Sequence, residues 1–197
     1  MDDEVIPQNP CKIKGAGDAK AAERPTSSVP QVQELTQAMP EHYRALVQFL
    51  VRSGIRIGEA AALQRKDSQP SSNAPTLAVW ARIFKVRGVY ELDTPKSEAG
   101  VRTIALPPRL VSIMSEHLDT YTKDDPGALI FTTRTGGVML NNVQQMLRKA
   151  LDHMGRIEVR AAHDFRHTAM TLAAESGASL PELKQQLGQS TTAAAEG

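Results

Sequence analysis

The stretch from Ser53 to Ala60 reads Ser-Gly-Ile-Arg-Ile-Gly-Glu-Ala and joins two segments with helical periodicity. Apolar residues recur at helical spacing over residues 40–52, just before it. Gly54 is suited to end that helix, because glycine readily adopts the left-handed conformation of a helix cap. A second, shorter helix is expected over residues 56–63, so the sequence predicts that Arg56 stands at the start of a helix. The apolar residues of the first helix are Tyr43, Leu46, Val47, Leu50 and Val51.

The rest of the interpreted chain is predicted to be mostly helical, with strands in its middle. Residues 76–106 alternate apolar and polar side chains and are rich in β-branched and aromatic residues, which indicates an antiparallel sheet. No internal repeat is present. The predicted helices on either side are residues 29–39, 109–121, 142–154 and 163–176, with Ser179–Glu182 as a capping box that opens a further one.

The bulk composition is that of an ordinary globular protein. A length of 197 residues, with 41% hydrophobic and 23% charged residues, is enough for one domain with a hydrophobic core. Residues 1–28 mix Pro, Gly, Ala and Lys without periodicity and are interpreted as a linker or tail. The acidic first residues, the single cysteine Cys11 and the lack of a long apolar run predict a soluble cytoplasmic protein without a membrane segment.

Positive charge is concentrated in one part of the chain. The net charge is only +1, but residues 52–109 hold ten basic and five acidic residues and so carry +5. Such a segment suits a surface that binds a polyanion, for example nucleic acid. A solvated surface of mixed charge is the competing interpretation, and charge alone does not decide between the two.

Two further clusters contain residues that can act on a phosphate. Thr-Pro-Lys-Ser-Glu-Ala-Gly-Val-Arg-Thr places Lys96 in or beside a β-turn, and His-Asp-Phe-Arg-His-Thr places His163 and Arg166 on one helix face. With Arg56, these residues make up the set that phosphodiester cleavage without a metal requires. Guanidinium groups bind the non-bridging oxygens and stabilise charge on the phosphorus. A lysine can protonate the leaving alkoxide, and a histidine can move protons near pH 7.

Each cluster is weak evidence by itself. An arginine at a helix start is usually a surface residue, and a His-x-x-Arg pattern often arises by chance. His163 and His167 lie four residues apart and could bind a metal, so a metal-dependent hydrolase is an alternative. No third histidine, cysteine or carboxylate is spaced to complete a zinc site, and therefore no metal or other cofactor is predicted.

Taken together and in order, the three clusters resemble the motifs of the catalytic domain of tyrosine recombinases, the phage integrase family. The resemblance extends over about Thr26 to Glu196. It implies an α+β, mainly helical fold with a small antiparallel sheet. Leu-Gly-Gln-Ser, which ends at Ser190, resembles the next box of the family. The catalytic residues that the resemblance implies are Arg56, Lys96, His163, Arg166 and Gln189, with Glu59 as a supporting acid that orients the basic groups.

Two departures from the family pattern concern the C-terminal part. Gln189 stands where the family usually has histidine or tryptophan, so a hydrogen-bond donor remains but proton chemistry is lost. The nucleophilic tyrosine would lie at or just beyond Gly197, and no tyrosine follows Tyr121. Residues 29–197 are therefore expected to be a catalytic domain truncated before its nucleophile, and an N-terminal DNA-clamping domain is expected to be absent before residues 1–28. The missing tyrosine is explained equally by a truncated chain and by a decayed integrase gene.

The function that the resemblance implies is site-specific DNA recombination through a 3′-phosphotyrosyl intermediate. Double-stranded DNA attachment sites are the expected partners, and the complete protein is expected to self-associate on DNA. Without the tyrosine, this chain is expected to bind DNA but not to cleave it. The alternative is a non-catalytic DNA-binding or regulatory remnant of an integrase.

Overall fold

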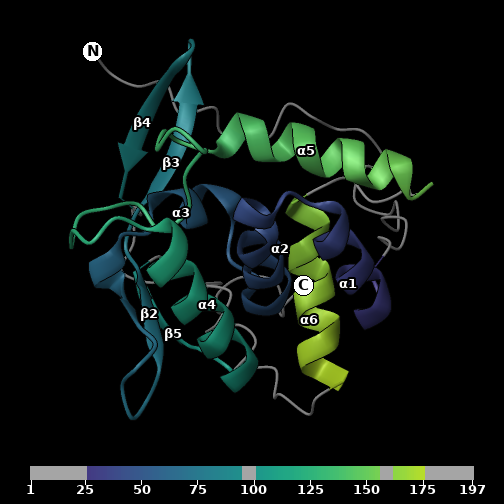
Figure 1. Cartoon of the computed structure of the whole chain (residues 1–197), viewed down its shortest axis with the longest axis horizontal. Helices are drawn as coiled ribbons and strands as arrows, with labels where there is room; N and C mark the ends of the chain where they lie inside the picture. The colour runs from purple at the N-terminus through teal and green to yellow at the C-terminus, as the bar shows by residue number, and fades with distance from the viewer. Residues whose placement is uncertain (1–25, 95–100, 156–161, 176–197) are drawn as a thin grey trace, which may run out of the picture.

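The computed structural model describes residues 26–94, 101–155 and 162–175, and this part of the chain is mainly helical with short strands (Figure 1). The described helices are α1 (Val29–Ala38), α2 (Glu41–Ser53), α3 (Ile57–Ala62), α4 (Pro108–Tyr121), α5 (Leu140–His153) and α6 (Ala162–Glu175), together with the 3-10 turn η1 (Arg65–Asp67). The described strands are β1 (Ser68–Gln69), β2 (Thr76–Val79), β3 (Arg82–Val86), β4 (Val89–Asp93) and β5 (Arg102–Ala105).

The predicted helices within these ranges are confirmed, with ends that differ by at most two residues. The predicted turn at residues 95–100, the capping box at Ser179–Glu182 and most of the tail at residues 1–28 lie outside the described residues. None of the helices in the described ranges is long and apolar enough to cross a membrane.

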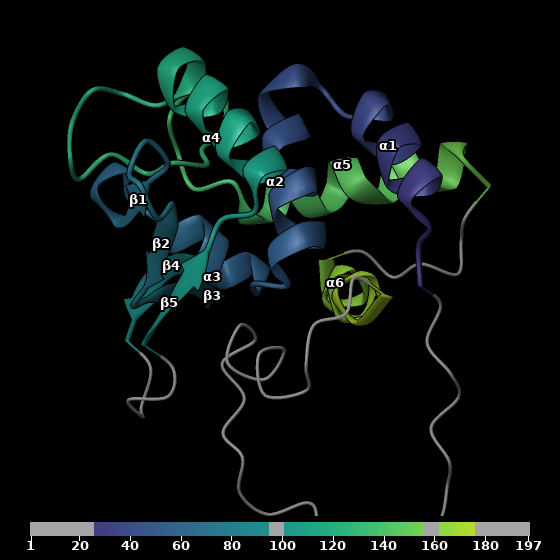
Figure 2. The same cartoon turned by 90° about the horizontal axis from the view of Figure 1, so that it is seen from below.

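Helix α2 forms the centre of the hydrophobic core. Helices α1, α4 and α6 all pack against it (Figure 2). Leu46, Phe49 and Leu50 of α2 have no exposed surface, and Phe165 of α6 is 1% exposed. Burial of apolar surface is the main stabilising term of such a core. This packing places α6 beside the end of α2, although more than a hundred residues of sequence separate the two helices.

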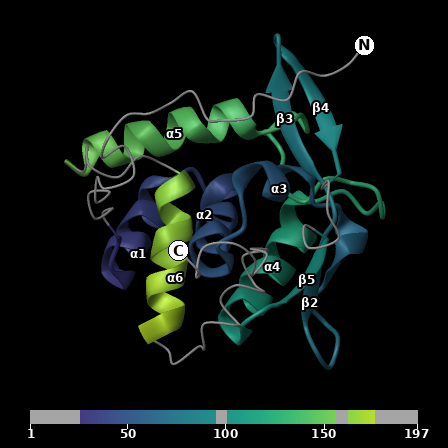
Figure 3. The ribbon, with the colours of Figure 1, turned by 180° about the vertical axis from the view of Figure 1, so that it is seen from behind.

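The strands form two small antiparallel sheets instead of one. β2 pairs with both β1 and β5, whereas β3 pairs only with β4. The hairpin β3–β4 is thus inserted between the paired strands β2 and β5, and the two units extend to opposite sides of α3 (Figure 3). Alternation in a sequence identifies a strand but not its partner, so the sequence alone did not predict the division. Arg87 and Gly88 have φ angles of 48° and 90°, as a tight two-residue hairpin turn requires.

Two glycines fix the path of the chain between α2 and the hairpin. Gly54 ends α2 with φ 65°, and its N–H donates to the carbonyl of Leu50 at 3.0 Å. This confirms the predicted left-handed cap. Gly58 lies in the first turn of α3, where a Cβ atom would stand 2.8 Å from the carbonyl oxygen of Ile83 in β3. Only a residue without a side chain lets α3 approach the strand so closely.

Candidate functional site

Arg56 is the residue immediately before α3, at the point where the chain leaves the Gly54 cap. Its side chain is 54% exposed, so the guanidinium group is available to a ligand. The backbone N–H of Arg56 donates to Oε2 of Glu59 at 2.9 Å, and its Nη1 donates to Oε1 at 3.3 Å. A single carboxylate therefore holds both the start of the helix and the exposed arginine.

Glu59 is buried beneath Arg56 and is also bound by Arg102 of β5. Nη1 and Nη2 of Arg102 donate to the two carboxylate oxygens at 3.3 and 3.0 Å, and the side chains of Arg102 and Glu59 are 6% and 9% exposed. Burial raises the pKa of Glu59, but the hydrogen bonds and charge of Arg102, followed by those of Arg56, outweigh burial and lower it. The carboxylate is therefore ionised at neutral pH and gives the cluster a fixed negative charge.

Arg166 reaches the same region from α6. Its Nη1 donates to the carbonyl oxygen of Gly54 at 3.0 Å, which joins α6 to the α2–α3 turn across 112 residues of sequence. The pKa of Arg166 is lowered to about 10, first by burial and then by the positive charge of Arg56, while Glu59 partly offsets this by raising it. A group with this pKa still carries its charge at neutral pH. Arg56 and Arg166 thus lie close enough for their positive charges to repel each other. A bound anion would reduce this repulsion.

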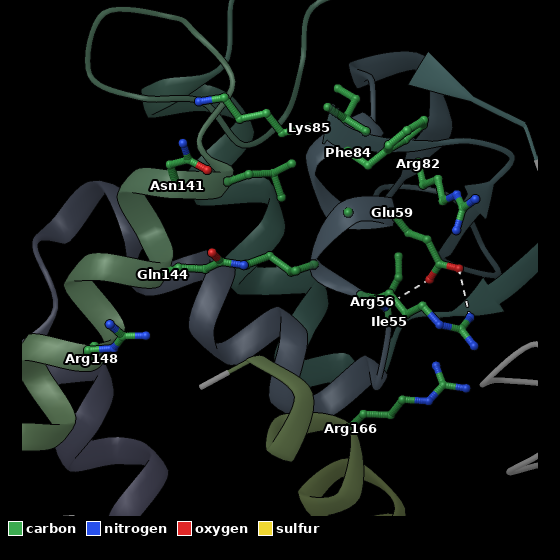
Figure 4. A pocket seen from close by; sticks show the side chains of 14 residues that line it. Ile55, Arg56, Glu59, Arg82, Phe84, Lys85, Asn141, Gln144, Arg148 and Arg166 are labelled. Carbon is green, nitrogen blue, oxygen red and sulfur yellow. Dashed lines mark hydrogen bonds and ion pairs between the residues drawn. The ribbon is translucent and has the colours of Figure 1, made fainter. Parts of the chain in front are cut away.

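The arginine cavity is the hollow of about 690 Å³ that these side chains line (Figure 4). Arg56 and Arg166 extend in the same direction on one side of it, and α5 forms the other side. Glu59 is the single acid among the described residues of the lining. This excess of positive charge suits an anionic ligand. The cationic residues of the lining are Arg56, Arg82, Lys85, Arg148 and Arg166.

Several predicted site residues fall outside the part of the chain that the structure describes. Lys96 and Gln189 lie outside it altogether. His163 belongs to α6, three residues before Arg166, but its side chain is outside the described part. Of the predicted set, Arg56, Glu59 and Arg166 are brought together. In the described residues no group of three histidine, cysteine or acidic side chains could hold a metal ion, and the pairing of His163 with His167 is not tested.

The sequence interpretation assigned no role to Arg102 or to the residues of α5 that line the cavity. Arg102 has the inward position of a strand in which buried and exposed residues alternate, with Ile104 as its buried neighbour. An arginine at a core-facing strand position needs a buried acid, so the alternation itself was a usable signal. The polar side chains by which α5 lines the cavity belong to Asn141, Gln144 and Arg148, on the polar face of an amphipathic helix. A helical pattern by itself does not reveal what that face meets.

Comparison with known proteins places this site in a family. The model of the phage integrase family matches residues 28–195. The chain belongs to this family. It is 34% identical over 198 residues to the prophage phiRv2 integrase of Mycobacterium tuberculosis, with 98% of this chain and 52% of the relative covered. It is 28% identical to the integrase of Mycobacterium phage FRAT1, with 97% and 58% covered. The chain thus spans about half the length of these curated relatives.

Solved structures with the same fold are recombinases. The Tn1549 transposon integrase in complex with circular intermediate DNA has a TM-score of 0.74 at 20% identity, with 94% of this chain and 66% of that chain covered. XerA recombinase has a TM-score of 0.66 at 18% identity, with 95% and 58% covered. These likenesses confirm the predicted mainly helical recombinase fold, in which the strands form two small antiparallel sheets where one was predicted.

Proposed function

We propose that this chain is the part of a site-specific DNA recombinase that binds the phosphate at which a DNA strand is cut and rejoined. The observation that carries the proposal is the position of Arg56 and Arg166, which enter one basic cavity from elements far apart in sequence. Membership of the phage integrase family, and the DNA-bound state of the Tn1549 integrase neighbour, support duplex DNA as the substrate. Self-association on DNA belongs to the complete protein in this proposal.

The proposed chemistry begins with the two arginines. Arg56 and Arg166 donate hydrogen bonds to the non-bridging oxygens of the phosphate and stabilise the negative charge that builds up during attack. Glu59 keeps Arg56 in place through the contacts at 2.9 and 3.3 Å, and it offsets part of the repulsion between the arginines. The residues therefore form an electrostatic site that is organised before DNA binds.

Proton transfer is assigned to residues beyond the described side chains. In the proposed mechanism Lys96 protonates the leaving 5′ oxygen, His163 assists proton transfer, and Gln189 donates a hydrogen bond to the phosphate. No metal is required, because the guanidinium groups supply the positive charge. A tyrosine oxygen would attack the phosphorus and form a 3′-phosphotyrosyl bond as the bond from phosphorus to the 5′ oxygen breaks. The tyrosine proton would pass to a base, with His163 as the candidate, while the leaving 5′ oxygen takes its proton from Lys96.

The tyrosines of the described residues are not placed to act as this nucleophile. Tyr43 is 2% exposed within the core, and Tyr121 packs edge-on against His42 with ring centroids 5.0 Å apart. Tyr90 lies under Lys85 in the hairpin. None of the three belongs to the lining of the arginine cavity. We therefore propose that the 197-residue chain binds DNA without forming a covalent bond to it.

A covalent-trapping experiment tests this proposal. A DNA site is first enriched from a random duplex pool, and a nick is then placed in it so that a cleaved strand cannot be rejoined. We expect no protein–DNA adduct on a denaturing gel with the 197-residue chain, and an adduct when a C-terminal segment with a tyrosine is fused after Glu196. Arg166→Ala in the fusion should abolish the adduct. A fusion that binds DNA but stays inert would favour the non-catalytic remnant, with Gln189 as the first residue to restore to histidine.

A further inference from the structure

A smaller hollow, which we call the loop pocket, lies where the start of α2, the end of α4 and the loop at residues 128–136 meet. Its volume of about 400 Å³ is within the range of pockets that hold small molecules. The described lining contains two side chains with a permanent positive charge, Lys123 and Arg134, and no acid. Such an excess of positive charge in a small hollow favours an anionic ligand.

The two cations of the loop pocket are not neutralised by neighbouring acids. Asp124, which follows Lys123, pairs with Arg65 at 3.5 Å. The carboxylate of Asp125 accepts a hydrogen bond from the N–H of Gly127 at 2.7 Å. Neither cation of the pocket forms an ion pair with another described residue. Their charge is therefore available to a ligand.

The loop that carries Arg134 is held in one conformation by its own hydrogen bonds. The N–H of Thr133 donates to the carbonyl of Gly137 at 2.8 Å, and the N–H of Gly136 donates back to the carbonyl of Thr133 at 2.9 Å. The Thr133 hydroxyl accepts the N–H of Gly137 at 2.9 Å and shares a hydrogen bond of 3.0 Å with the hydroxyl of Thr135. Because the loop is already ordered, a ligand that binds it meets only a small entropic cost.

Aromatic rings form another part of the lining. Tyr121, at the end of α4, is 36% exposed, and its ring lies edge-on to that of His42 with the centroids 5.0 Å apart. His42 is fixed in turn, because its Nε2 donates to the carbonyl of Thr132 at 2.7 Å. A partly exposed tyrosine ring in the same hollow as two cations suits a ligand that has both a phosphate and a flat ring.

The loop pocket is separate from the arginine cavity. His42 lies in the first turn of α2 and lines the loop pocket, whereas Ile55 and Arg56, just beyond the last turn, line the arginine cavity. The two hollows share no described lining residue. A helix of 13 residues is about 20 Å long, so one phosphate cannot occupy both sites.

We propose that the loop pocket binds the phosphate of a small phosphate ester, with nucleoside monophosphates as the preferred class of ligand. Lys123 and Arg134 donate hydrogen bonds to the phosphate oxygens, and the base packs against the ring of Tyr121. This site does not depend on the DNA phosphate proposed for the arginine cavity, so either proposal can fail without the other.

NMR spectroscopy of the isotope-labelled 197-residue chain at low ionic strength tests the inference. The backbone amide signals of Gly136 and Gly137 report on the loop pocket, since both residues belong to the loop that carries Arg134. We expect both signals to shift on titration with adenosine monophosphate. Ribose phosphate, which has the phosphate but no base, should shift the same signals only at a higher concentration.

Variants with matched controls show which side chains bind the phosphate. Arg134→Gln and Lys123→Gln should each weaken binding of adenosine monophosphate about 5- to 10-fold. The controls are Arg109→Gln in α4 and Lys149→Gln in α5, which remove exposed cations outside the loop pocket and should weaken binding less than twofold. Thermal melting confirms that each variant folds.

Four outcomes would overturn the inference. Unchanged signals of Gly136 and Gly137 at saturating adenosine monophosphate would show that the pocket binds no phosphate ester. Equal weakening by the variants and their controls would reduce the effect to net charge. Equal affinity for adenosine monophosphate and ribose phosphate would remove the preference for nucleotides. Signals that shift with a short DNA duplex but not with adenosine monophosphate would assign the pocket to the DNA-binding surface instead.

Discussion

The protein has two cavities of similar size, and the charged side chains that line them differ. The arginine cavity is lined by five cations and one acid among its described residues. The second, which we call the histidine cavity, measures about 800 Å³ between α1, α2 and α4 and contains three glutamates, two arginines and a histidine. Its charges nearly cancel. Cavity size alone is therefore a poor guide to function here, and the excess of positive charge singles out the arginine cavity.

The polar group beneath each cavity shows the same contrast. Beneath Arg56, the buried Glu59 stays ionised because Arg102 binds both of its oxygens. In the histidine cavity, burial lowers the pKa of His117 to about 4, so this side chain is neutral. Its Nε2 donates to the carbonyl of Ile130 at 3.0 Å, and its Nδ1 has no hydrogen-bond partner in the described residues. The arginine cavity thus has a charged group beneath it, because Glu59 is paired with Arg102. The buried group of the histidine cavity, His117, is uncharged.

The largest effect is expected from breaking the buried pair. Arg102→Met leaves Glu59 buried without its main partner and should lower the free energy of unfolding by about 3 to 5 kcal/mol. Arg82→Met is the matched control, because it breaks an ion pair with Asp93 in which the two side chains are 53% and 32% exposed. It should cost about 1 kcal/mol or less. Urea unfolding measures both, and equal losses would show that the buried pair has no special weight.

The second effect concerns the histidine cavity and depends on pH. His117 has a pKa of about 4 in the folded protein and 6.5 in a free histidine, so the unfolded chain takes up its proton first as the pH falls. The stability linked to His117 is full above pH 6.5 and is lost as the pH falls towards 4, by about 3 kcal/mol. His117→Gln keeps a donor for the Ile130 carbonyl and does not titrate.

The variant isolates this contribution from the other groups that titrate in acid. The difference in unfolding free energy between wild type and His117→Gln should fall with decreasing pH between 6.5 and 4. A difference that stays constant between pH 6.5 and 4 would mean that burial does not depress the pKa of His117.

A smaller effect is expected from the glycine that brings α3 against β3. Gly58→Ala places a Cβ 2.8 Å from the carbonyl oxygen of Ile83, so the helix must move and with it Arg56. We expect a loss of about 1 to 3 kcal/mol in urea unfolding and weaker DNA binding. Gly137→Ala, where the nearest atom is the Thr133 hydroxyl at 3.4 Å, serves as the control and should change both little. An unchanged Gly58→Ala protein would show that the site tolerates a shift of α3.

The sequence predicted most of the helices and three residues of the arginine cavity, but not every residue that lines or supports this cavity. Helical periodicity located the helices within two residues, and Gly54 was identified as a cap because its conformation is a local property. The ordered clusters located Arg56, Glu59 and Arg166, which share one cavity. Arg102 and the cavity face of α5 received no role, because a partner 43 residues away and the object that a helix face meets depend on tertiary packing. The same limit explains why the strands were not divided into two sheets.

The arginine cavity, and not the histidine cavity, is the site at which we propose that a DNA phosphate binds. The most direct test compares Arg56→Ala with Arg109→Ala, an exposed arginine that lines the histidine cavity. Affinity for a 20-base-pair duplex is measured by anisotropy over a series of salt concentrations. We predict that Arg56→Ala weakens binding and reduces the log–log salt slope by about 0.9, the loss of one phosphate contact, while Arg109→Ala leaves the slope unchanged. A normal slope for Arg56→Ala, or a slope reduced only by Arg109→Ala, would contradict the claim.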